Sequence, residues 1–164
     1  MRSQTRPLDG DLGRHTTIAD IEKAIASRWY RKDRELRINA PKRSIGRYAG
    51  FECYVIDSEW VRDNLDVTFG TGGHGLVHTF IPLNEIWLDP IRESEWSLIF
   101  HEAVEFFFML HQNMNYWEAH NKALDLQRSK VVSKENVERL IAEATKSSLF
   151  QSIGLMNLKL AGVR

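Results

Sequence analysis

The sequence predicts an α+β protein, in which a small, mainly antiparallel sheet packs against one long apolar helix and two to three further helices. Short runs rich in β-branched and aromatic residues, separated by turn residues, fill the region 51–89. Segments with helical periodicity lie on both sides of this region. With 164 residues, 43% of them hydrophobic, the chain is long enough to bury the core of one domain.

The first expected element is a helix. Residues 1–15 are polar and show no periodicity, which predicts a flexible N-terminal tail before a single domain at 16–164. From Thr17, the sequence TIADIEKAIASRWY spaces its apolar residues as a helix does, and Thr17 suits the N-cap. The next stretch, 31–50, is dense in charge and broken by proline and glycine, so we expect an exposed connection.

Strands and then helices follow this connection. The runs FECYVID, DVTFG, GLVHTFI and EIWLD predict strands at 51–57, 66–70, 75–81 and 85–89. The pattern then becomes helical, and we expect helices at 91–111, 116–130 and 133–148, with Asp89 and Ser133 as caps. The apolar residues 149–164 are expected to pack back on the domain.

The predicted helix at 91–111 contains polar residues in an apolar setting. The stretch LIFHEAVEFFFML, residues 98–110, holds ten apolar residues together with His101, Glu102 and Glu105. His101 and Glu105 are four residues apart and share a helix face, and Glu102 lies beside them. Burying such groups without partners costs about 1–3 kcal/mol each, and more for a charge. The pattern H-E-x-x-E therefore needs something that satisfies these side chains.

A divalent metal is one solution, since imidazole and carboxylate are both normal zinc ligands. His101 and Glu105 would supply two ligands, and His120, on the next predicted helix, is the best candidate for the third. Glu102 would then be free to act as general base towards an activated water. The alternative is a set of core polar groups, with His101 hydrogen-bonded to a carboxylate or carbonyl.

These residues resemble a known family. HEAVE on a helix, EIWLD just upstream and YWEAH downstream, together about 80–128, are similar to the zincin-like metallopeptidases, in particular to an H-E-x-x-E variant in uncharacterised phage and bacterial proteins. The resemblance implies a twisted sheet packed on an active-site helix and an edge strand, EIWLD or GLVHTFI, that pairs with a peptide substrate. It also implies a metal-dependent hydrolase, a peptidase that uses zinc.

The sequence departs from the standard H-E-x-x-H signature at Glu105. A carboxylate in place of the second histidine makes the metal a weaker Lewis acid and also suits Mn or Fe. Three further residues are weaker candidates for the site. His74, in a glycine-rich stretch, could stabilise an oxyanion, Tyr116 could hydrogen-bond a tetrahedral intermediate, and Asp125 could orient a ligand histidine.

Composition and charge limit the compartment, the kinds of site and the partners that the sequence predicts. Its one cysteine, Cys53, excludes an internal disulfide and a cysteine-rich zinc site, and it favours the cytoplasm. We expect neither a signal peptide nor a membrane-spanning run. Residues 1–50 carry twelve Lys+Arg against six Asp+Glu. The basic stretch 28–47 suggests an alternative function, a non-catalytic phage or bacterial protein that contacts nucleic acid or a protein partner.

Overall fold

A computed structural model describes residues 39–78, 80–92, 95–112 and 114–145. The predicted tail, the helix expected at 17–30 and the segment 149–164 lie outside the described residues. The elements are β1 (Lys42–Tyr48), β2 (Phe51–Ile56), α4 (Ser58–Asn64), β3 (Gly72–His74), β4 (Glu85–Leu88), the 3-10 turn η1 (Pro90–Arg92), α5 (Trp96–His111), α6 (Tyr116–Arg128) and α7 (Val137–Thr145). The predicted α+β class is confirmed.

The sheet has the strand order β1-β2-β4-β3 and is mixed. β1 pairs antiparallel with β2 and β3 antiparallel with β4, but the central pair, β2 and β4, is parallel. A parallel pair needs a crossover, and α4, which the sequence analysis missed, lies in it. The Asp57 side chain starts α4 directly after β2 by accepting hydrogen bonds from the backbone N–H groups of Glu59 and Trp60.

Three sequence predictions about this region are wrong. The segment 66–70 turns instead of extending, because the Asp66 carboxylate accepts hydrogen bonds from the backbone and hydroxyl of Thr68. The described residues of the segment 75–81 lie in turns and bends and not in a strand, so the edge strand is β3 and not GLVHTFI. In the expected connection 31–50, residues 42–48 form β1, since β2 offers them a hydrogen-bonding edge.

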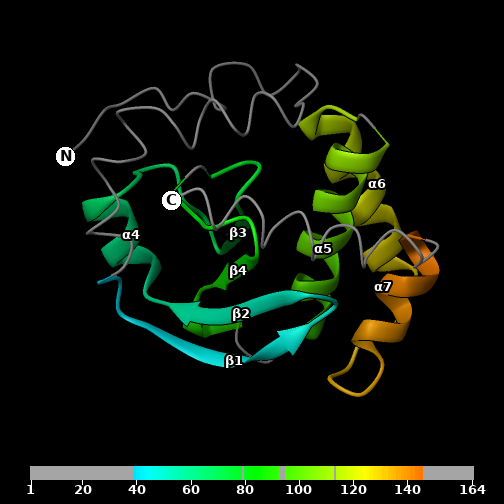
Figure 1. Cartoon of the computed structure of the whole chain (residues 1–164), viewed down its shortest axis with the longest axis horizontal. Coiled ribbons are helices and arrows are strands. Elements are labelled where there is room, and N and C mark those ends of the chain that lie inside the picture. Colours follow the sequence, from blue (N-terminus) through cyan, green and yellow to red (C-terminus); the bar gives the residue numbers. More distant parts are fainter. Residues whose placement is uncertain (1–38, 79, 93–94, 113, 146–164) are drawn as a thin grey trace.

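Helix α5 lies between the sheet and the other two long helices (Figure 1), with contacts to β3 and β4 on one side and to α6 and α7 on the other. It begins at Trp96 and not at 91, because Pro90–Arg92 forms a separate 3-10 turn. α6 begins at the predicted residue, where Asn115 and Glu118 form a capping box. α7 begins at Val137, later than the predicted Ser133.

The position of α5 explains its composition. All residues from Ile99 to Met109 are buried, so that an apolar helix is covered on every side by sheet and helices. Phe106 packs edge-to-face against Phe51 of β2, with ring centroids 5.1 Å apart. Across the described part of the chain, helices are too short or too polar to cross a lipid bilayer. The polar side chains His101, Glu102 and Glu105 of α5 are buried along with the apolar ones.

Substitution of a glycine in the turn after β3 tests how closely the backbone packs there. A Cβ atom on Gly75 would lie 2.6 Å from the backbone oxygen of Ile81, whereas a Cβ atom on Gly70 would meet nothing within 4 Å. We expect Gly75→Ala to lower the free energy of unfolding by about 1–3 kcal/mol because backbone must move. The matched control Gly70→Ala should change it by no more than about 0.5 kcal/mol. Urea denaturation measures both, and equal stabilities would contradict this account of the turn.

Candidate metal centre

Helix α5 carries three buried polar side chains close to the edge of the sheet. His101, Glu102 and Glu105 are each less than a tenth exposed. His101 and Glu105, one helical turn apart, are in direct contact, with 3.0 Å between His101 Nε2 and Glu105 Oε2. The predicted spacing therefore brings an imidazole and a carboxylate together on the inner face of the helix.

The next helix adds a second imidazole to this pair. α6 folds back along α5, and His120 places its Nδ1 atom 2.8 Å from Glu105 Oε2 and 3.1 Å from His101 Nε2. The three atoms thus form a triangle with sides of 2.8, 3.0 and 3.1 Å. The structure brings together the three residues that the sequence analysis selected as ligands.

Protonation alone does not satisfy this triangle. A hydrogen bond requires one hydrogen between two atoms, and each ring nitrogen either donates or accepts. If both His101 Nε2 and His120 Nδ1 carry hydrogens, two N–H groups face each other. If one nitrogen is the donor, its single hydrogen has to serve both of its neighbours. No protonation state places a separate hydrogen on each side, so one polar contact is always poorly satisfied.

A divalent cation would accept a lone pair from each of the three atoms. Zinc takes such ligands at about 2.0–2.1 Å, which puts the atoms of a tetrahedral set about 3.3 Å apart. The observed separations, 2.8 to 3.1 Å, are only slightly shorter. Two imidazoles and one carboxylate are also a normal donor set for catalytic zinc. His101, Glu105 and His120 therefore fit a metal ion in both chemistry and spacing.

A third histidine contacts the other oxygen of Glu105. His74, at the end of β3, is fully buried, and its Nε2 atom lies 2.9 Å from Glu105 Oε1. The sequence places His74 in a glycine-rich stretch, as a candidate for stabilising an oxyanion. The structure instead places it in a strand, in contact with Glu105. This contact joins residues 31 positions apart, and no local pattern could have revealed it.

The pKa values of the two carboxylates, Glu105 and Glu102, are shifted in opposite directions. Burial alone would raise the pKa of Glu105, but hydrogen bonds from His101, His120 and His74 lower it well below its usual value. Glu102 is also buried but lies 4.0 Å from the nearest imidazole nitrogen, His74 Nε2. Burial and the neighbouring charge of Glu105 raise its pKa to about 7. For His101, burial lowers the pKa, but the bond to Glu105 and the nearby carboxylates give a net rise.

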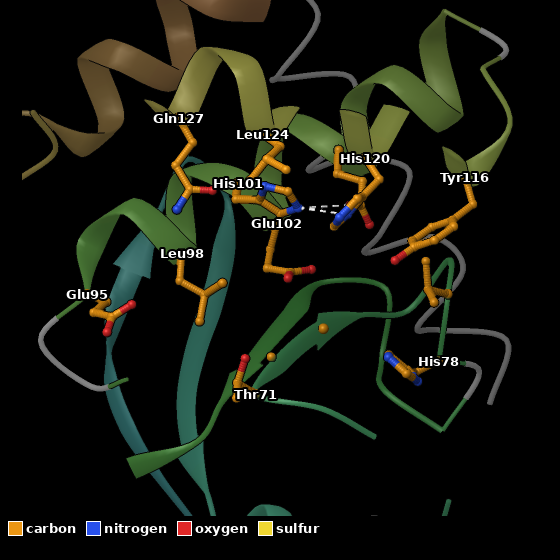
Figure 2. Close-up of a pocket in the computed structure, with 14 residues that line it drawn as sticks. Thr71, His78, Glu95, Leu98, His101, Glu102, Tyr116, His120, Leu124 and Gln127 are labelled. Atoms are coloured by element: carbon orange, nitrogen blue, oxygen red, sulfur yellow. Dashed lines mark hydrogen bonds and ion pairs between the residues drawn. The ribbon is translucent and has the colours of Figure 1, made fainter. Parts of the chain in front are cut away.

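The side chains of His101, Glu102, Glu105 and His120 line a cavity of about 350 Å³ between α5, α6 and β3. Figure 2 shows the Glu102 carboxylate and the Tyr116 hydroxyl pointing into the space between the helices and the sheet. The Tyr116 ring stacks on His120, with centroids 5.3 Å apart. Burial, followed by the charges of Glu105 and Glu102, raises the pKa of Tyr116, so its hydroxyl is protonated at neutral pH.

Two other positions differ from expectation. Asp125, a candidate for orienting a ligand histidine, is exposed on α6 and does not line the cavity. Gln127 does line it, and its side chain contributes to the raised pKa of His101, whose buried Nδ1 atom has no hydrogen-bond partner among the described residues. Gln127 follows His120 by seven residues, two helical turns, and this spacing was the signal that could have identified it.

Comparisons with protein-family models, with curated proteins and with solved structures give no significant match to this chain. The resemblance to zincin-like metallopeptidases thus stays a prediction.

The metal content of the purified protein tests whether His101, Glu105 and His120 bind an ion. We expect protein purified without a metal-affinity tag to contain about one equivalent of zinc or another divalent ion, because three donor atoms converge on one position. His120→Ala should lose this metal. The control is His111→Ala, which removes a histidine at the end of α5 that does not line the cavity. Elemental analysis gives the metal content, and equal content in both variants would rule out His120 as a ligand.

The raised pKa of Glu102 predicts a pH dependence in metal-free protein. Between pH 4.5 and about 7 the unfolded chain releases the Glu102 proton while the folded protein keeps it. The unfolded state therefore binds fewer protons, and the contribution of Glu102 to the free energy of unfolding falls as the pH rises through this range. Glu102→Gln should remove this fall. Urea denaturation in the presence of a chelator measures it, and parallel pH profiles for both proteins would contradict the prediction.

Proposed function

We propose that this chain is a metal-dependent hydrolase of the zincin-like type that cleaves a peptide or another amide. One observation carries the proposal: His101, Glu105 and His120 converge on one point, and Glu102, the buried carboxylate beside them, is left out of that convergence. A set of ligands next to a free carboxylate is the arrangement that metal-assisted hydrolysis requires.

A divalent ion held by His101, Glu105 and His120 would supply a Lewis acid that activates water for attack at neutral pH. Glu102 points into the same cavity and is not hydrogen-bonded to the three ligands. Its carboxylate can accept the proton of the attacking water and later donate it to the leaving amine. A general base works best when its pKa lies near the working pH, and burial moves Glu102 in that direction.

Tyr116 provides a hydrogen-bond donor on the opposite side of the cavity. Its hydroxyl points inward (Figure 2), and its raised pKa keeps the proton in place. It can therefore donate to an oxygen that gains negative charge during attack. The stacking on His120 fixes the ring relative to the ligands.

The edge of the sheet supports a peptide substrate. β3 is the last strand in the order β1-β2-β4-β3, and its residues Gly72 and Gly73 line the cavity beside Glu102. An extended peptide could add to this edge by main-chain hydrogen bonds. The substrate-side strand would then be β3. EIWLD is β4 and is paired on both sides, and GLVHTFI is not a strand.

The alternative function, binding through the basic stretch 28–47, gains no support from the described part of that stretch. The Lys42 ammonium lies 2.8 Å from Glu85 and over the rings of Tyr54 and Trp87. Arg47 is paired with Glu52 at 3.6 Å. These two cations are at least partly neutralised within the protein, so we retain the hydrolase proposal.

Substitution of the general base tests the proposal. Glu102→Gln keeps the size of the side chain but cannot accept a proton, so turnover should fall by about 10²–10⁴-fold. Metal content should stay unchanged because Glu102 is not one of the three proposed ligands. The control Glu143→Gln changes an exposed glutamate on α7 and should leave both properties as they are.

The assay is cleavage of a mixed peptide library by metal-loaded protein, followed by mass spectrometry. Glu102→Gln protein that cleaves at the wild-type rate would exclude Glu102 as the base. Metal-loaded wild-type protein that cleaves no peptide or simple amide would overturn the hydrolase proposal.

A further inference from the structure

Two overlapping groups of side chains at this site have metal-ligand chemistry. One is His101, Glu105 and His120, and the other is His74, Glu102 and Glu105. Both groups use Glu105, through different oxygens: Oε2 faces His101 and His120, and Oε1 faces His74. The site therefore has two possible forms, a single metal ion or a pair of ions bridged by the Glu105 carboxylate.

The hydrogen bonds of His74 distinguish these forms. The backbone N–H of Leu76 donates to His74 Nδ1 at 3.2 Å, so Nδ1 must present a lone pair. A neutral imidazole with a bare Nδ1 carries its hydrogen on Nε2. That hydrogen points at Glu105 Oε1, 2.9 Å away, and makes a hydrogen bond to the carboxylate. His74 Nε2 then has no lone pair to offer to a metal.

The alternative assignment is unfavourable. If His74 Nε2 bound a metal, the ring hydrogen would move to Nδ1 and would face the N–H of Leu76 across 3.2 Å. Two donors would then oppose each other in a fully buried place, where an unsatisfied N–H costs free energy. Glu102 Oε2 is also 4.0 Å from His74 Nε2, so the second group is less compact than the first.

We propose that His74 is a positioning residue: its Nε2–H group holds one oxygen of Glu105, so that the other oxygen alone faces His101 and His120 and the centre holds one metal ion. The inference rests on the proposed metal site. A ligand carboxylate that is fixed by an outer hydrogen bond is oriented for binding, and loss of such a partner weakens metal affinity. Glu102 then keeps both oxygens for proton transfer.

The surroundings of His74 hold its ring in this orientation. The side chain is fully buried and contacts the Phe106 ring of α5 edge-on, with centroids 5.4 Å apart. β3 pairs with β4 through His74 and Ile86. Since strand pairing fixes the backbone and Phe106 limits the ring, His74 has little freedom to turn its nitrogens away from Leu76 and Glu105.

Metal titration tests the inference. We expect wild-type protein, freed of metal by a chelator, to bind one equivalent of Co²⁺, followed by its visible absorption. His74→Leu removes the donor and should weaken Co²⁺ binding about 10–100-fold without changing the stoichiometry. His74→Gln places an amide N–H near the position of Nε2 and should restore most of the affinity. Two equivalents in the wild type and one in His74→Leu would overturn the inference, because His74 would then be a ligand. Failure of His74→Gln to restore the affinity would equally exclude His74 as a hydrogen-bond donor to Glu105.

Nitrogen NMR of the histidine rings in wild-type protein shows which His74 nitrogen carries the hydrogen. It needs no substitution, so it tests the inference even if His74→Leu does not fold. The expected signals are a protonated Nε2 and a bare Nδ1 for His74, both before and after zinc addition. A metal-bound Nε2, or a hydrogen on Nδ1, would overturn the inference. If wild-type protein binds no metal at all, the proposed function fails, and the NMR signals of His74 still decide its tautomer.

Discussion

The buried carboxylate of Glu105 is the group on which the rest of the site depends. A charge taken out of water is costly unless hydrogen bonds or opposite charges replace its hydration. Glu105 is 3% exposed, and imidazole nitrogens of His74, His101 and His120 lie 2.8 to 3.0 Å from its two oxygens. These histidines come from β3, α5 and α6, so one carboxylate joins the edge of the sheet to both helices. The same contacts keep the carboxylate ionised and ready to bind a cation.

The chemistry of the site depends on a difference between two glutamates only three residues apart. Glu105 is surrounded by donors and has a lowered pKa, whereas Glu102 is buried, lies 4.0 Å from His74 Nε2 and has a pKa raised to about 7. A pair of titratable groups whose environments move their pKa values apart is the usual basis for assigning acid–base roles. In this site the difference gives one glutamate to ligand binding and leaves the other for proton transfer.

Glycine residues in β3 allow the sheet and α5 to approach closely. A Cβ atom on Gly72 would lie 3.3 Å from the side chains of Leu88 and Leu98, so a larger residue would crowd Leu98 of α5. At Gly73 a Cβ atom would come within 2.4 Å of the His78 side chain. This close approach lets His74, the next residue, reach Glu105. The glycine-rich stretch thus contributes both to packing and to the site.

The sequence by itself determined the parts of this protein that depend on local spacing. Periodicity placed α5 and α6, and the four-residue interval put His101 and Glu105 on one face. The short turn before α6 made His120 the natural third member. Only the tertiary structure decided the parallel pairing of β2 with β4, the edge position of β3 and the contact of His74 with Glu105. These features join residues far apart in the chain, and no local propensity encodes which distant segments pair once the core has formed.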